Sequence, residues 1–181
     1  MKKLETFGEK ERAIVEERRR SGYRVERLSR FDGELEPHLR ALVARLLPGV
    51  PPTIDLAAFV DTHAEHSLGR GDRAPGLPAI VELLRQGLEA LAERGFATLP
   101  EDQQDALIRR MRRGAADEEL GLPAKEFVDR LLVKALAGYL AHPSTWKQIG
   151  FNGPAYPEGY AWISVGATAR RHEGFPGASR L

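Results

Sequence analysis

The chain has no cysteine among its 181 residues. This absence excludes disulfide bonds, a thiolate nucleophile, iron–sulfur ligation by this chain and any zinc site built on cysteine. It leaves the compartment open, because a chain without cysteine tolerates both reducing and oxidising surroundings.

An excess of charge of either sign is also missing. The chain has 27 Lys and Arg residues against 26 Asp and Glu residues, a net charge of +1. Such a balance creates no global field that would attract nucleic acid or an anionic membrane. No stretch approaches the ~20 consecutive apolar residues that span a bilayer. We therefore expect neither nucleic-acid binding nor direct membrane insertion.

The first residues are polar and lack the apolar core of an export signal. Arg18, Arg19 and Arg20 supply positive charge, but no uninterrupted apolar run follows them. The sequence as written predicts no export signal of its own. The expected location is the cytoplasm, or the periplasm if a signal has been removed.

Apolar residues recur at three- and four-residue spacings, which a helix collects on one face. Asp55 is placed to cap one helix, and Thr98 with Glu101 has the spacing of a capping box that opens another, ending at Gly114. No segment shows sustained alternation, so the fold class is all-α. The other predicted helices span 35–47, 55–68, 78–94 and 124–140, and the most apolar of them, 124–140, is expected at the centre of the bundle.

The chain divides into three parts by composition. Residues 1–34 form a polar arm or surface helix, 35–141 an irregular helical bundle, and 142–181 an extended loop and tail rich in aromatic residues, Gly and Pro. Proline fixes φ, and glycine adopts φ values closed to other residues, so such a loop can hold one irregular shape while presenting several aromatic side chains.

Aromatic side chains dominate the energetics of protein interfaces, so the loop is a candidate anchor for a partner protein. The same loop could instead fold back over its own bundle. It contains neither a P-loop nor the Gly-x-Gly-x-x-Gly fingerprint, and no nucleophile beside an obvious base. The predicted partner-binding residues are Trp146, Ile149, Gly150, Phe151, Asn152, Gly153, Pro154, Tyr156, Pro157, Tyr160 and Trp162.

The end of the last helix and this loop resemble a known family. Residues 138–143 read Gly-Tyr-Leu-Ala-His-Pro, 146–151 read Trp-Lys-Gln-Ile-Gly-Phe, and 153–160 read Gly-Pro-Ala-Tyr-Pro-Glu-Gly-Tyr. This pattern is similar to the carboxy-terminal signature of gluconate 2-dehydrogenase subunit 3 proteins. The resemblance extends over roughly 35–162.

The resemblance implies a non-catalytic small subunit that binds and stabilises a large flavoprotein of the glucose–methanol–choline (GMC) oxidoreductase type. FAD is expected in that partner, which would oxidise a hydroxyl of a sugar, polyol or sugar acid, with a cytochrome as a further acceptor in some complexes. No cofactor is expected in this chain. Many family members also carry an export signal, a feature that the polar amino terminus lacks.

Two other classes stay open on the residues alone. Asp61, His63, His66 and His142 could form a metal site in a free-standing enzyme, because imidazole and carboxylate are common metal ligands. His142 has the simpler role of donating to the last carbonyls of the preceding helix.

The second open class is a helical module that binds nucleic acid through arginine clusters. One cluster is Arg18–Arg20, and the other consists of Arg109, Arg110, Arg112 and Arg113. Acidic residues surround the second cluster in sequence, which favours a solvated helix held by ion pairs.

Overall fold

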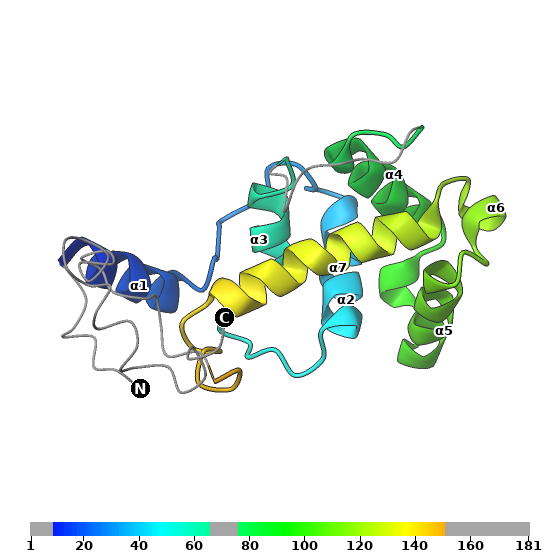
Figure 1. Ribbon diagram of the computed structural model, residues 1–181. Coiled ribbons are helices and arrows are strands. Elements are labelled where there is room, and N and C mark those ends of the chain that lie inside the picture. Colours follow the sequence, from blue (N-terminus) through cyan, green and yellow to red (C-terminus); the bar gives the residue numbers. More distant parts are fainter. Residues whose placement is uncertain (1–8, 66–75, 151–181) are drawn as a thin grey trace, which may run out of the picture.

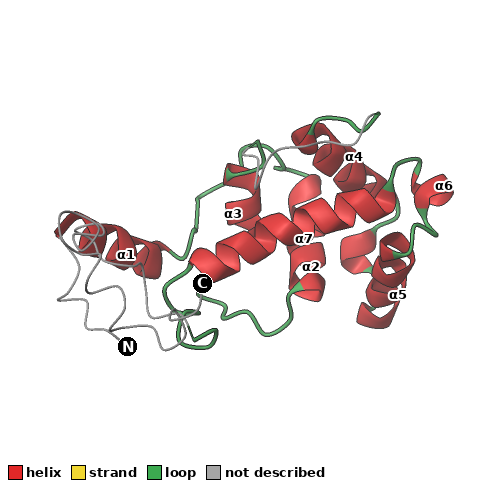
Figure 2. Ribbon diagram, in the orientation of Figure 1, coloured by secondary structure: helices red, strands yellow, loops and turns green. Residues whose placement is uncertain are grey.

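The computed structural model describes residues 9–65 and 76–150, and within these ranges the chain forms helices and no strand (Figure 2). The all-α prediction is confirmed for this part of the chain. No helix in it is long and apolar enough to cross a membrane. The helices are α1 (Glu9–Ser21), α2 (Leu35–Leu46), α3 (Leu56–Thr62), α4 (Ile80–Glu93), the 3-10 helix η2 (Phe96–Thr98), α5 (Glu101–Arg112), α6 (Asp117–Leu120) and α7 (Ala124–Ala141).

Helix α7 is the central element, as the sequence predicted. It contacts α2, α3, α4, α5 and α6, and Figure 1 shows it running the length of the bundle. Five side chains on one of its faces are completely buried: Ala124, Phe127, Val128, Leu131 and Ala135. Their spacing of one, three and four residues is the spacing that one helix face collects. The rest of the helices therefore pack around this face.

Two glycines allow helices to approach α7 closely. A side chain at Gly87 of α4 would overlap the ring of Phe127, and a Cβ at Gly138 of α7 would lie 2.7 Å from ring atoms of Phe59. Real Cβ atoms do not approach other atoms so closely, so both positions depend on the missing side chain. Glycine in a helix interior lowers the stability of the helix. Here the glycines allow the rings of Phe127 and Phe59 to pack against the helix backbone, which offsets that loss.

The segment after α1 belongs to the core, although the composition of 1–34 is polar. Leu28 is 1% exposed and Phe31 is fully buried. Helix α1 itself lies apart from the bundle, beyond the carboxyl end of α7 (Figure 1). A corner at Gly22 and Tyr23, both with positive φ, connects α1 to the rest of the chain.

Two local predictions are wrong. The helix predicted over 55–68 ends at Thr62, and the next carbonyl, that of His63, accepts a hydrogen bond of 2.9 Å from the Lys134 Nζ. A buried ammonium on α7 thus takes the carbonyl that a further helical turn would use. The prediction that Asp55 caps this helix is confirmed, since its side chain accepts from the Ala58 N–H.

The predicted capping box of Thr98 and Glu101 does not form. Thr98 lies in η2, and its hydroxyl donates to the Gly95 carbonyl instead of accepting at the start of α5. Helix α5 follows Pro100 and has no side-chain cap. The left-handed turn at Gly95 places Thr98 in a separate 3-10 turn, where its hydroxyl has a nearer acceptor.

Candidate partner-binding surface

The face of α7 opposite the core carries an exposed apolar stripe. Val133 is 48% exposed, Leu136 38% and Leu140 42%. Spacings of three and four residues place these side chains one above the other on a helix. An apolar stripe on a helix that already buries its other face is a common feature of protein-binding surfaces.

The turn after α7 folds back on the end of the helix. The Trp146 indole N–H donates to the Leu140 carbonyl at 3.1 Å, and the Thr145 hydroxyl donates to the Tyr139 carbonyl at 2.6 Å. Tyr139 in turn donates to the Gln148 Oε1 at 2.7 Å. The first two bonds satisfy carbonyls that a helix end leaves open. The indole N–H is therefore held at the Leu140 carbonyl, at the carboxyl end of α7.

The structure describes three of the eleven predicted partner-binding residues. Ile149 is 44% exposed, Gly150 is exposed with φ of +69°, and Trp146 is half-buried against the helix end. The beginning of the predicted loop thus packs on its own helix, as the alternative interpretation expected. The other eight lie outside the described residues: Phe151, Asn152, Gly153, Pro154, Tyr156, Pro157, Tyr160 and Trp162.

The apolar stripe was not among the predicted partner-binding residues. We define the α7 face as Val133, Leu136, Leu140 and Trp146. The apolar composition of 124–140 predicts a helix at the centre of the bundle, whereas in the part of the chain that the structure describes one side of α7 stays exposed. The signal that could have revealed it is the second apolar series at 133, 136 and 140, out of phase with 127, 131 and 135.

Asp61 does not have the role of a metal ligand. Its Oδ1 accepts from the backbone N–H groups of Arg30 and Phe31 at 2.8 and 2.9 Å. Its Oδ2 accepts from the N–H and the hydroxyl of Ser29 at 2.9 and 3.0 Å. Burial opposes ionisation of this carboxyl group, but the four hydrogen bonds outweigh it and lower the pKa of Asp61. The carboxylate therefore holds the segment before α2 in place.

The two described histidines of the predicted metal site, His63 and His142, contact different residues. His63 stacks on Phe59 with ring centroids 4.1 Å apart, and its Nδ1 lies 3.0 Å from the Phe59 carbonyl. His142 lies at the other end of an aromatic series, with its ring 5.3 Å from Tyr23. His66 is outside the described residues. Within the part that is described, no three His, Asp or Glu side chains are grouped so that they could hold a metal ion.

His142 joins α7 to α1 instead of capping its own helix. Its Nε2 lies 2.9 Å from the Arg18 carbonyl, in the last turn of α1, and its Nδ1 accepts from the Ser144 N–H at 3.3 Å. The Thr145 hydroxyl hydrogen-bonds to the carbonyls of Tyr139 and His142, at the helix end where the imidazole was predicted to donate. The imidazole is therefore an inter-helix contact that requires an unprotonated Nδ1.

Buried imidazoles predict a loss of stability in mild acid. Burial lowers the pKa of His38 and of His142, and the charges of Arg19 and Arg18 contribute at His142. The unfolded chain then binds more protons than the folded chain below the ordinary pKa of about 6.5. We expect the free energy of unfolding to be constant above this pH and to fall below it.

Urea titrations between pH about 7.5 and about 5.5 measure this dependence. The His142→Gln variant should show a shallower slope, because the amide does not titrate. His38, whose Nδ1 accepts from the Ala97 N–H at 3.1 Å, supplies the remaining slope. If the stability of His142→Gln depended on pH as steeply as that of the unaltered chain, the pH dependence would not come from His142.

Two arginines of the second cluster lie near acidic side chains. Arg110 forms an ion pair with Glu119, and Arg109 lies near enough to Asp105 to contribute to its lowered pKa. Arg45 of α2 binds both oxygens of Asp105, at 2.8 and 2.6 Å, so this acidic residue also connects two helices. The prediction of a solvated helix held by ion pairs is confirmed for Arg110.

Comparison with known families agrees with the resemblance in the sequence. The family model described as gluconate 2-dehydrogenase subunit 3 matches residues 36–153. This range begins in α2 and includes α7, the α7 face and the turn that follows. No curated protein and no solved structure was found to match the chain.

Proposed function

The chain belongs to the gluconate 2-dehydrogenase subunit 3 family, and we propose that it is a non-catalytic small subunit that binds and stabilises a large GMC-type flavoprotein. The α7 face is the observation that carries this proposal. It presents apolar side chains to solvent from the most central helix of the bundle. A partner that covered the face would remove this area from water at no cost to the core.

The half-buried Trp146 suits the centre of such an interface. Its N–H is already bonded to the Leu140 carbonyl, so binding a partner leaves no polar group of the indole to be satisfied. Its orientation is fixed before the partner arrives, which lowers the entropy cost of association. Aromatic residues held in this way are frequent among the few residues that dominate binding energy.

In this proposal FAD belongs to the partner, which oxidises a sugar, a polyol or a sugar acid by hydride transfer. The small subunit contributes a surface and no reacting group. Its anchors are the α7 face together with the aromatic loop of 151–162, and the electrons leave through the partner, to a cytochrome subunit where one is present.

The variant Leu136→Asp tests the α7 face. We expect its affinity for the flavoprotein to fall by a factor of roughly ten or more, because the carboxylate would lose its water in the middle of an apolar contact. The tagged small subunit is co-expressed with the GMC-type flavoprotein of the same organism, and the flavin absorbance of the purified complex is measured at decreasing concentrations.

The matched control is Ile14→Asp, which makes the same kind of change at an apolar side chain that is 46% exposed on α1. Both changes are at the surface, so helical content by circular dichroism should be unchanged. Equal flavin recovery from Leu136→Asp and from the unaltered chain would show that the α7 face is not the interface. Failure of the unaltered chain to recover any flavoprotein would refute the proposed function itself.

A further inference from the structure

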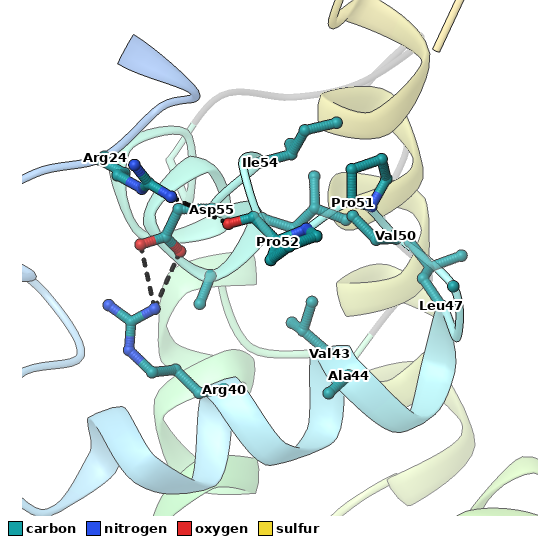
Figure 3. A pocket seen from close by; sticks show the side chains of 13 residues that line it. Arg24, Arg40, Val43, Ala44, Leu47, Val50, Pro51, Pro52, Ile54 and Asp55 are labelled. Atoms are coloured by element: carbon teal, nitrogen blue, oxygen red, sulfur yellow. Dashed lines mark hydrogen bonds and ion pairs between the residues drawn. The ribbon is translucent and has the colours of Figure 1, made fainter. Parts of the chain in front are cut away.

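A concave site lies between α2 and the segment that leads into α3 (Figure 3). Its volume is about 430 Å³, within the range of sites that bind ligands. Its wall is mainly apolar and includes Val43, Leu47, Val50, Ile54, Leu56 and Ala57. We call it the α2–α3 pocket. This pocket and the α7 face have no residue in common.

Two arginines border this pocket, and they differ in how their charges are balanced. Arg40 Nη1 lies 3.0 Å from both carboxylate oxygens of Asp55, and its Nε donates to Glu36 at 2.8 Å. Asp55 also caps α3 through the Ala58 N–H. These contacts neutralise Arg40 and fix Asp55, so neither group is available to a ligand of opposite charge.

Arg24 has no such carboxylate partner among the residues that the structure describes. Its Nη2 donates to the Pro52 carbonyl at 3.0 Å, and the side chain is otherwise exposed (Figure 3). A guanidinium has five N–H donors in a fixed planar fork that matches a carboxylate. The border of the α2–α3 pocket therefore combines an apolar wall with one positive charge that is not neutralised.

The backbone around this charge is rigid before any ligand binds. The Gly22 carbonyl accepts from the Asp55 N–H at 2.7 Å. The Cα of Gly22 lies so close to the Thr53 carbonyl that a Cβ on Gly22 would overlap this carbonyl. Tyr23, with φ of 66°, donates to the Gly138 carbonyl at 3.0 Å. Arg24 follows directly, so the corner sets where its side chain begins, and this preorganisation favours binding.

We propose that the α2–α3 pocket binds a segment of the flavoprotein partner in which an acidic side chain stands beside an apolar one. The carboxylate pairs with Arg24, and the apolar side chain lies on the apolar wall, where Leu47 and Val50 are only half-buried. The occupant is a protein segment because the pocket is open at Ala44 and Pro52, both exposed, whereas pockets for small molecules enclose most of their ligand. This inference rests on the proposed function and adds a second contact to it.

The variant Arg24→Gln removes the charge and keeps a donor for the Pro52 carbonyl. We expect roughly tenfold weaker assembly with the flavoprotein, and a partial recovery with Arg24→Lys. Ala44→Trp, which places a bulky ring at the open side of the pocket, should weaken assembly without a change of charge. The measurement is dissociation of the co-expressed complex on dilution, at low and at high salt.

The Arg24→Lys variant also identifies the occupant directly. A carbodiimide joins an amine to a carboxylate in contact with it, so treating the complex should link position 24 to an Asp or Glu of the flavoprotein. Mass spectrometry of the linked peptide should find an apolar residue next to that acid. A link to an acidic stretch without apolar neighbours, or no link to the flavoprotein, would overturn the proposed chemistry.

The matched control for charge is Arg27→Gln, at an exposed arginine that is paired with Asp32. It should assemble like the unaltered chain. If Arg24→Gln and Ala44→Trp also assembled normally while Leu136→Asp did not, the pocket inference would fail and the proposed function would stand. If the unaltered chain did not assemble with the flavoprotein, both would fail.

Discussion

The variant Asp61→Ala should lower the free energy of unfolding by about 3–5 kcal/mol, a large fraction of the stability of a domain of this size. The Asp61 side chain is 1% exposed and accepts hydrogen bonds from the backbone of Ser29, Arg30 and Phe31. Removing the carboxylate leaves these N–H groups without an acceptor beside the buried Phe31 ring. A buried donor that loses its partner costs about 1–3 kcal/mol.

Urea unfolding at neutral pH measures this loss. Ser29→Ala is the matched control, because it removes the hydroxyl bond to the same Oδ2, together with a long 3.5 Å contact from Arg30 Nη1, and should cost about 1 kcal/mol. A loss of about 1 kcal/mol or less for Asp61→Ala would mean that water replaces the carboxylate.

The same variant carries a pH signature. The pKa of Asp61 is lower in the folded chain than its ordinary value of 3.8. The carboxylate therefore contributes its stability above that value and loses it as the pH falls through the lower, folded pKa. The difference in free energy of unfolding between Asp61→Ala and the unaltered chain should become smaller in this acidic range. The free-energy difference caused by Ser29→Ala should also become smaller there. Ser29 does not titrate, so that change would come only from protonation of Asp61.

Periodicity predicts the long helices well because their stability comes from burying one face. The predicted 35–47 and 124–140 agree with α2 (Leu35–Leu46) and α7 (Ala124–Ala141) to within a residue at each end. The predicted 78–94 begins two residues before α4 (Ile80–Glu93) and ends one residue after it. In each case the apolar pattern and the glycine or proline that follows give the same boundary.

Tertiary contacts decide the boundaries that periodicity misses. Lys134 is far from His63 in sequence, yet its ammonium binds the His63 carbonyl at the end of α3. Asp61 was assigned to a possible metal site because the sequence shows only its type and its neighbours. Its actual donors lie about thirty residues earlier, in a segment whose average composition is polar. No local pattern contains that pairing.

The partner-binding surface was only partly predicted from the sequence, again because tertiary packing decides which side chains are exposed. Family resemblance identifies the end of α7 and the residues around Trp146, because their order along the chain is specific. Exposure of Val133, Leu136 and Leu140 depends on which side of α7 the other helices occupy. Periodicity indicates that two apolar series exist on 124–140, but only the packing of α3 and α5 against α7 shows which of them is covered.

The variant Gly87→Ala should destabilise the chain, although helix propensity alone predicts the opposite. Alanine in a helix interior is favoured over glycine by about 0.5–1 kcal/mol. At Gly87 the added methyl group would overlap three ring atoms of Phe127, which is fully buried at the contact of α4 with α7. The ring cannot move without displacing its neighbours, and overpacking of a core costs typically 1–3 kcal/mol and occasionally more.

We therefore expect a net loss of about 1–3 kcal/mol for Gly87→Ala, read as a lower urea midpoint with an unchanged slope. A double-mutant cycle with Phe127→Leu separates the clash from other effects. Phe127→Leu alone loses ring packing, but the smaller side chain makes room for the methyl group, so the two losses together should be clearly less than their sum. Additive losses would mean that Gly87→Ala acts through the backbone and not through the Phe127 ring, and a gain of stability would show that α4 can move away from α7 without cost.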